Sequence, residues 1–122
     1  MTTDAPKKTI LVVEDEFLVN AMISMELEDV GYDVLSADSG DAALAWFANG
    51  RQIDLLFTDI KLAGSMDGWS VARKARQLRP GLKIVYATGY TPSAADLVEG
   101  ARFFLKPYLP TQFIAVVGEM LG

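Results

Sequence analysis

The sequence predicts a doubly wound α/β fold, in which helices cover both faces of a five-stranded parallel sheet. Short apolar runs without polar alternation recur along the 122 residues, a pattern typical of strands buried on both faces. Segments with helical spacing separate these runs, and such alternation implies right-handed βα units. The length allows one ordinary domain, which we expect over residues 9–122 after an N-terminal extension over 1–8.

Five strands and five helices are expected to alternate along this domain. The strands are expected over 9–13, 32–37, 53–58, 83–87 and 101–105. The helices are expected over 17–30, 40–49, 69–78, 92–98 and 110–121.

Residues with strong cap preferences bound the elements of the first half. The run TILVV over 9–13 is apolar throughout, which favours a central strand. Gly31 stands where a helix needs a left-handed residue at its end. After the second strand, Ser39 can accept a hydrogen bond from the first turn of the next helix, and that helix ends near Asn49-Gly50.

Proline and glycine bound the elements of the second half. Pro80-Gly81 closes the third helix, and Gly100 closes the fourth. Pro92 and Pro110 both suit the first turn of a helix, where a backbone N–H is not needed. The last helix carries an apolar stripe, which is interpreted either as core or as a dimer face; its members include Phe113, Ile114 and Val117.

The composition excludes several kinds of chemistry. Cysteine and histidine are both absent from the sequence, so disulfides, thiolate or imidazole metal ligands and an imidazole base are ruled out. A net charge of −5 argues against binding to nucleic acid, and the basic residues between Arg73 and Arg79 are interpreted as a solvated helix face. No stretch resembles a membrane anchor or a signal peptide, so we expect a cytoplasmic protein without membrane contact.

Three carboxylates follow two of the expected strands. Glu14 and Asp15 come directly after the first strand, and Asp59 follows the third. The carboxyl ends of parallel strands meet at one crevice, so these side chains are expected to lie close together. Two like charges about 4 Å apart repel by roughly 4 kcal/mol at an effective dielectric near 20, so the cluster implies a bound cation. Mg²⁺ is the ion expected from an all-oxygen ligand set.

Two further residues at the same edge complete a reactive constellation. Lys106 follows the fifth strand and brings a mobile positive charge, while Thr88 follows the fourth and brings a hydroxyl. A carboxylate nucleophile, a metal ion, a lysine and a hydroxyl are what phosphoryl transfer onto an aspartate requires.

Five short motifs at the ends of these strands resemble the receiver domain of two-component response regulators. They are EDE at 14–16, TDIKL at 58–62, MDG at 66–68, ATG at 87–89 and LKP at 105–107. The resemblance covers nearly the whole chain and implies a flavodoxin-like sheet with strand order 2-1-3-4-5. The run YATGY at 86–90 is also similar to a receiver subgroup with an aromatic-Ala-Thr-Gly signature.

The resemblance implies roles for the acidic cluster. Asp59 is expected to be the phospho-acceptor. Glu14, Asp15 and Asp59 are expected to hold Mg²⁺ together with the backbone carbonyl of Lys61. Glu14 or Asp15 alone is better read as a solvated group at a helix start, where acidic residues are favoured anyway. Asp59, directly after an apolar strand, is less easily explained in that way.

The same resemblance implies roles in phosphoryl binding and switching. Thr88 and Lys106 are expected to contact the phosphoryl group, and Phe103 is expected to be the switch aromatic that turns when Thr88 moves. Phe103 is equally well explained as a plain core residue. Lys61 and Tyr90 border the path of the hydrolytic water and are expected to set the lifetime of the phosphoryl group.

Two segments depart from the usual pattern of the family. The loop IKLAGSMDG after Asp59 lacks the expected proline and is one residue longer than the commonest form. The span from Thr88 to Lys106 is about one helical turn shorter than is typical, which predicts a short or irregular fourth helix.

The implied function is a signalling domain that catalyses only its own phosphorylation and dephosphorylation. A histidine kinase or a histidine phosphotransfer protein would supply the phosphoryl group, and a downstream protein would read the altered surface; a homodimer is a further alternative. Two other functions remain open, a degenerate receiver that only binds partners and a Mg²⁺-dependent aspartyl-phosphate phosphatase. A phosphatase of the haloacid dehalogenase type would want an aspartate where Lys61 stands.

Overall fold

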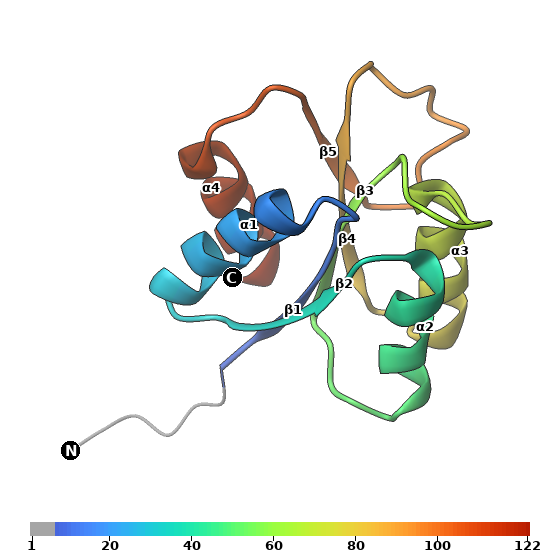
Figure 1. Ribbon diagram of the computed structural model, residues 1–122, viewed down its shortest axis with the longest axis horizontal. Helices are drawn as coiled ribbons and strands as arrows, with labels where there is room; N and C mark the ends of the chain where they lie inside the picture. The colour runs from blue at the N-terminus through green and yellow to red at the C-terminus, as the bar shows by residue number, and fades with distance from the viewer. Residues whose placement is uncertain (1–6) are drawn as a thin grey trace.

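The computed structural model describes residues 7–122 and has the predicted α/β architecture (Figure 1). The strands are β1 (Thr9–Val13), β2 (Asp33–Ala37), β3 (Leu55–Asp59), β4 (Lys83–Thr88) and β5 (Arg102–Leu105). The helices are α1 (Phe17–Asp29), α2 (Gly40–Ala48), α3 (Gly68–Leu78) and α4 (Pro110–Leu121). Most of the predicted extension over 1–8 lies outside the described residues.

All five strands are parallel and lie in the order β2-β1-β3-β4-β5, which confirms the predicted topology. The order reverses between β1 and β3, and in open α/β sheets the crevice at such a reversal is the usual place for a ligand. Asp59 at the end of β3 lies opposite Ala87 of β4, and Thr88 lies opposite Leu105 of β5. The acid and the hydroxyl therefore reach the same edge of the sheet.

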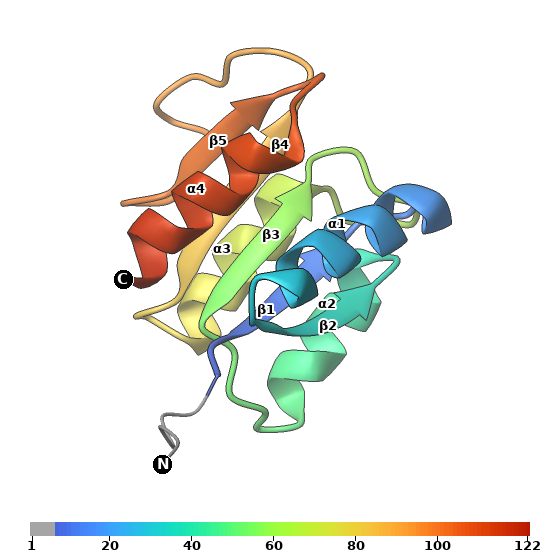
Figure 2. The same cartoon turned by 90° about the vertical axis from the view of Figure 1, so that its left-hand side faces the viewer.

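Helices α2 and α3 cover one face of the sheet, and α1 and α4 cover the other (Figure 2). On the second face, Ile23 and Leu27 of α1 and Phe113 and Val117 of α4 are buried against apolar side chains of the strands. The alternative for Phe113 and Val117 is thereby settled, because both side chains are fully buried in the core and neither is available for a dimer face.

The predicted start of α2 is confirmed in detail. The Ser39 hydroxyl accepts a hydrogen bond from the Ala42 N–H at 3.1 Å, so the serine caps the helix. Asp67 caps α3 in the same way through the Ser70 N–H at 2.9 Å. This second cap fixes where α3 starts relative to the long loop that follows Asp59.

The predicted helix over 92–98 does not form, and that part of the prediction was wrong. Instead of a helical ladder, the Val98 N–H donates to the hydroxyl of Tyr86 at 3.4 Å, a partner on β4. The Asp96 carboxylate accepts from both the N–H and the hydroxyl of Ser93, which closes a single turn. Arg76 of α3 donates to the Glu99 carbonyl at 2.8 Å and ties down the end of the segment. A local turn and two hydrogen bonds to β4 and α3 thus take the place of the short helix.

The remaining boundaries differ from the prediction by one or two residues. The largest of these shifts is at β3, which begins at Leu55 instead of residue 53. Within residues 7–122, no helix combines the length and the apolar character that crossing a bilayer would need.

Gly68, the first residue of α3, allows the helix to approach the end of β3. A Cβ atom added at Gly68 would lie 2.1 Å from the carbonyl oxygen of Asp59 and 2.8 Å from the Cα atom of Ile60. The Gly68 N–H donates to the Ile60 carbonyl at 2.7 Å, which holds the two segments at this distance. The Cβ atom of any other residue would collide with the backbone of Asp59 and Ile60 at the expected phospho-acceptor.

We therefore expect Gly68→Ala to lower the free energy of unfolding by about 3 kcal/mol, the upper end of the usual cost of overpacking. Gly81→Ala is the matched control, because nothing lies within 4 Å of a Cβ atom placed there. The control should leave stability unchanged or raise it slightly. Urea unfolding followed by circular dichroism measures both variants, and equal stabilities would contradict the steric explanation.

Candidate functional site

The three predicted carboxylates come together at the edge of the sheet. Glu14 and Asp15 leave β1 at its carboxyl end, and Asp59 is the last residue of β3. One carboxylate oxygen from each residue can be chosen so that all three atoms lie within 4.8 Å of one another. Glu14 and Asp59 are buried, whereas Asp15 is exposed. The arrangement follows from two adjacent parallel strands that end at the same level.

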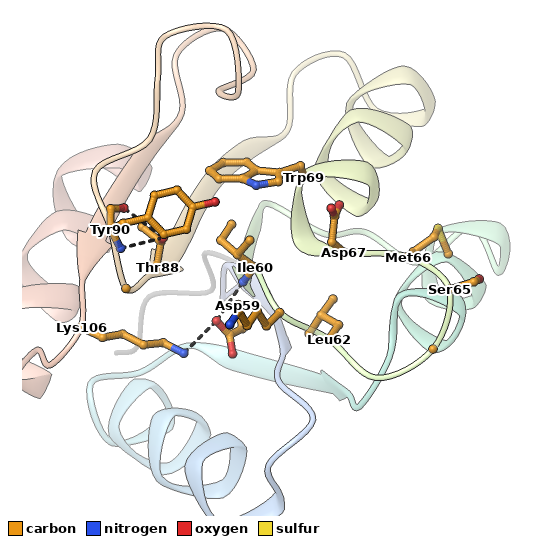
Figure 3. Close-up of a pocket in the computed structure, with 13 residues that line it drawn as sticks. Asp59, Ile60, Leu62, Ser65, Met66, Asp67, Trp69, Thr88, Tyr90 and Lys106 are labelled. Carbon is orange, nitrogen blue, oxygen red and sulfur yellow. Dashed lines mark hydrogen bonds and ion pairs between the residues drawn. The ribbon is translucent and has the colours of Figure 1, made fainter.

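The Asp59 carboxylate is held through one of its two oxygens. Its Oδ1 atom accepts a hydrogen bond from the Ile60 N–H at 2.8 Å and an ion pair from the Lys106 Nζ atom at 2.8 Å (Figure 3). Lys106 directly follows β5, which lies on the other side of β4 from β3, so its side chain extends past the end of β4 to reach Asp59. Within residues 7–122, Oδ2 accepts no hydrogen bond, and Asp59 lines the pocket described below.

The acidic cluster has the size and the chemistry of a Mg²⁺ site. Neighbouring oxygens on an octahedral Mg²⁺ lie about 3.0 Å apart and opposite ones about 4.2 Å, so three oxygens within 4.8 Å of one another can close on one ion by side-chain movement. The donors are carboxylates, which Mg²⁺ prefers, and no sulfur or imidazole ligand is needed. The side chains present therefore fit a hard divalent cation.

Without such a cation, the ionised form of Glu14 is disfavoured. The pKa of Glu14 is raised to about 7, chiefly by burial and in smaller part by the negative charge of Asp59. A hydrogen bond from the Glu16 N–H at 2.9 Å favours the ionised form and opposes these effects, as does the charge of Lys106. Burial is the largest of these causes, so the protonated form of Glu14 is favoured more than in an exposed carboxylate.

Thr88 faces a pocket of about 900 Å³ that opens beside Asp59. The threonine is buried, and its hydroxyl donates to the Tyr90 carbonyl at 3.0 Å and accepts from the Tyr90 N–H at 3.3 Å. Asp59, Tyr90 and Lys106 line the same pocket (Figure 3), as does Lys61. Glu14 and Asp15 instead line a second hollow of about 500 Å³, so the acidic cluster lies between the two.

Phe103 lies away from these hollows. Its side chain is partly buried and packs against the core beneath α2 and α3, opposite Tyr86 in the register of β4 and β5. The structure therefore brings together six of the expected site residues, namely Glu14, Asp15, Asp59, Lys61, Thr88 and Lys106, and leaves Phe103 behind the sheet edge. Tyr90 stands at the rim of the pocket and is 54% exposed.

Tyr108 borders the site and was not expected there. The pKa of Tyr108 is raised to about 12, chiefly by burial and also by the negative charges of Glu14 and Asp59. The ring packs edge-on to Phe113 at 5.7 Å and tilts against Phe104 at 5.8 Å, which forms an apolar wall next to the carboxylates. Its place two residues after Lys106 is the only signal in the sequence that points to this neighbourhood.

Asn20 is a second residue that the sequence analysis missed. Its side-chain amide donates to the backbone carbonyls of Val12, Glu14 and Ala37, at 3.4, 3.2 and 3.2 Å. An asparagine inside a helix, six residues after Glu14, gives no sign in the sequence that it reaches two strand ends.

The raised pKa of Glu14 predicts how stability depends on pH when divalent ions are absent. The folded state binds more protons than the unfolded state between the ordinary pKa near 4.5 and the folded pKa of about 7. The free energy of unfolding should therefore fall as pH rises through that window, by about 3 kcal/mol at most.

Urea unfolding from pH 4 to 8 in the presence of a chelator tests this. Glu14→Gln keeps the hydrogen-bond acceptor for the Glu16 N–H and should flatten the dependence. Glu28→Gln removes an exposed carboxylate of α1 and should retain it. The explanation fails if Glu14→Gln and the unmodified protein lose stability in parallel over this range.

The comparison with known proteins identifies a family. The family model of the response regulator receiver domain matches residues 10–117. The response regulator receiver protein CpdR of Brucella abortus (strain 2308) is 31% identical over 118 residues, which cover 93% of this chain and 97% of CpdR. Sensor kinase CckA of the same organism is 35% identical over 118 residues, but the chain spans only 12% of that kinase.

Solved structures agree with this assignment. A response regulator receiver protein from Sinorhizobium medicae WSM419 superposes with a TM-score of 0.88 at 33% identity, over 94% of each chain. The receiver domain of the hybrid histidine kinase CckA superposes with a TM-score of 0.82 at 30% identity, over 93% of this chain and 99% of that one. The chain therefore belongs to the response regulator receiver domains, the phosphoryl-accepting signalling domains of two-component systems.

Proposed function

We propose that this receiver domain takes a phosphoryl group from a phosphohistidine partner onto Asp59. One observation carries the proposal: a buried aspartate at the end of β3 is paired with Lys106 at 2.8 Å and grouped with Glu14 and Asp15. The pair engages Oδ1 of Asp59 and leaves Oδ2 without a hydrogen bond from residues 7–122. Surface ion pairs do not need a buried partner or two further carboxylates, so ordinary stabilisation does not explain the group.

Mg²⁺ is the proposed cofactor, held by Glu14, Asp15, Asp59 and the backbone carbonyl of Lys61. When bound, the ion would neutralise carboxylate charge and polarise the phosphoryl oxygens. Lys61 lies in the loop after β3, two residues beyond Asp59, and lines the pocket, which supports its place in the ligand set.

The proposed reaction is an in-line displacement at phosphorus. A carboxylate oxygen of Asp59 forms the new O–P bond while the N–P bond of the phosphohistidine breaks, and the electron pair of that bond returns to the ring. The ring is released as neutral imidazole once it has taken a proton. Lys106 remains beside the transferred group and stabilises its charge, and the Thr88 hydroxyl can turn from the Tyr90 carbonyl toward a phosphoryl oxygen.

The proposed readout begins with that movement of Thr88. Its hydroxyl now holds the turn at Tyr90, so release of the two hydrogen bonds would free the start of the segment over 91–100. That segment lacks a helix, and Phe103 packs close to where its end returns to the sheet. We propose that the irregular segment and Phe103 change position together, in a two-state equilibrium biased by the phosphoryl charge.

A histidine kinase or a histidine phosphotransfer protein is the proposed donor, and a downstream protein is the proposed target. Phe17 and Leu18 at the start of α1 are 81% and 78% exposed and lie next to Asp15. An apolar surface of this kind beside the crevice suits a protein donor, because the histidine must approach Asp59 from there. We propose that the domain acts in the cytoplasm without nucleic acid or membrane as ligand.

Two alternatives are less well supported. A degenerate receiver would be expected to lack Asp59, Lys106 or an acidic neighbour, and all of these are present. A phosphatase of the haloacid dehalogenase type would want an acid where Lys61 stands. We therefore propose that the domain is no general enzyme and that its chemistry is limited to its own phosphorylation and dephosphorylation.

Labelling by acetyl phosphate tests the proposed acceptor. We expect stoichiometric labelling that requires Mg²⁺, detected as a mass increase, and we expect Asp59→Asn to abolish it. Asp41→Asn, which changes an exposed carboxylate on α2, should label normally. Mg²⁺-dependent labelling that persists in Asp59→Asn refutes the assignment, and multiple turnover of acetyl phosphate by the unmodified protein favours the phosphatase.

Tyr90 is proposed to limit access of water to the phosphoryl group, together with Lys61. Its ring stands at the rim of the pocket, so Tyr90→Ala should speed dephosphorylation by a factor of about 3 or more. Tyr90→Phe keeps the bulk of the ring and should decay like the unmodified protein. The decay of the labelled species after removal of donor measures the rate, and identical decay in Tyr90→Ala would discard this role.

A further inference from the structure

Asn20 joins the two strand ends from which the acidic cluster projects. The residue lies in the first turn of α1 and is only 8% exposed. Its amide nitrogen lies 3.2 Å from the Glu14 carbonyl, 3.2 Å from the Ala37 carbonyl and 3.4 Å from the Val12 carbonyl. Val12 belongs to β1, Glu14 follows that strand, and Ala37 ends β2. One side chain therefore spans the carboxyl ends of two neighbouring strands.

The orientation of this amide is fixed by its surroundings. All three neighbours are carbonyl oxygens, which only accept, so the NH₂ group must face them. On its other side, the Asn20 carbonyl oxygen accepts a hydrogen bond from the Ser24 hydroxyl at 3.2 Å. Ser24 lies one helical turn further along α1. The side chain is therefore held at both of its ends.

These hydrogen bonds act on the backbone that carries two of the three carboxylates. The Glu14 carbonyl is bound by Asn20, the Glu14 N–H donates to the Ala37 carbonyl at 3.1 Å, and the Glu14 carboxylate accepts from Glu16. The backbone N–H and carbonyl of Glu14 and one oxygen of its carboxylate thus each have a partner, which restrains the direction of the side chain. Because Asp15 is the next residue along the chain, the restraint on the Glu14 backbone also limits the position of Asp15.

The mutual repulsion of the cluster makes such a restraint necessary. Glu14, Asp15 and Asp59 repel one another whenever no cation lies between them, and a loose loop would relieve the repulsion by moving Glu14 and Asp15 away from Asp59. The amide of Asn20 opposes that movement, because displacement of the loop would leave buried carbonyls without partners. The site is thereby preorganised before the metal binds.

We propose that Asn20 is a positioning residue that sets the affinity of the site for Mg²⁺. The proposal rests on the proposed function, since it assumes that the cluster binds this ion. Groups that orient metal ligands without touching the metal commonly change its affinity 10- to 100-fold when they are removed. An aspartate could not replace Asn20, because its carboxylate would face three carbonyl oxygens and add a fourth negative charge.

The test is titration of Mg²⁺ by isothermal calorimetry into the full chain and its variants. Asn20→Ala should raise the dissociation constant about 10-fold, and Ser24→Ala, which frees only the other end of the amide, should raise it by a factor of about 2 to 3. Val117→Ala is the control, since it opens the fully buried core under α4 and lowers stability without touching the loop. Its dissociation constant should match that of the unmodified protein.

A second measurement separates positioning from general damage. The Mg²⁺ concentration that gives half-maximal labelling by acetyl phosphate should rise about 10-fold in Asn20→Ala, while the rate at saturating Mg²⁺ should stay within about 3-fold. A folded Asn20→Ala that binds Mg²⁺ like the unmodified protein overturns the proposal, as does an equal loss of affinity in Val117→Ala. If Asn20→Ala does not fold, an unchanged affinity in Ser24→Ala overturns it. Failure of the unmodified protein to bind Mg²⁺ would instead refute the proposed function itself.

Discussion

Repulsion among three carboxylates at one sheet edge is the constraint on which the rest of the site depends. Glu14, Asp15 and Asp59 offer oxygens within 4.8 Å of one another, at a place where burial raises the pKa of Glu14 to about 7. Lys106 offsets part of this charge through Oδ1 of Asp59 and leaves the remainder for a cation. The cluster is costly without ligands and is thereby suited to bind them.

The fold holds this unfavourable arrangement from two sides. Beneath Asp59, Gly68 lets α3 approach the backbone so closely that no side chain would fit. Beside Glu14, the amide of Asn20 ties the end of β1 to the end of β2. The hydrogen bonds between Thr88 and Tyr90 are different in kind, because they are local and can be exchanged for bonds to a phosphoryl group. The crevice therefore combines a backbone held by Gly68 and Asn20 with a threonine whose hydrogen bonds can be exchanged.

The sequence predicted the features that depend on strand order and chain direction. Because parallel strands end at one edge, the positions of Asp59, Thr88 and Lys106 after apolar runs were enough to bring them together. The roles of Asn20 and Gly68 could not be predicted in the same way, since they depend on atoms that are distant along the chain. The helix expected over 92–98 failed for a related reason: the hydroxyl of Tyr86, a residue of β4, takes the N–H that the helix would have used.

A crystal structure with Mg²⁺ and beryllofluoride, which mimics the phosphoryl group, would show whether Asp59 accepts phosphate beside a bound metal. We expect beryllium attached to a carboxylate oxygen of Asp59, with Mg²⁺ about 2.1 Å from an oxygen of Asp59 and from one of Glu14 or Asp15. The hydroxyl of Thr88 and the ammonium group of Lys106 should contact the fluorides. Metal bound elsewhere, or an unmodified Asp59 with the Lys106 pair intact, would contradict it.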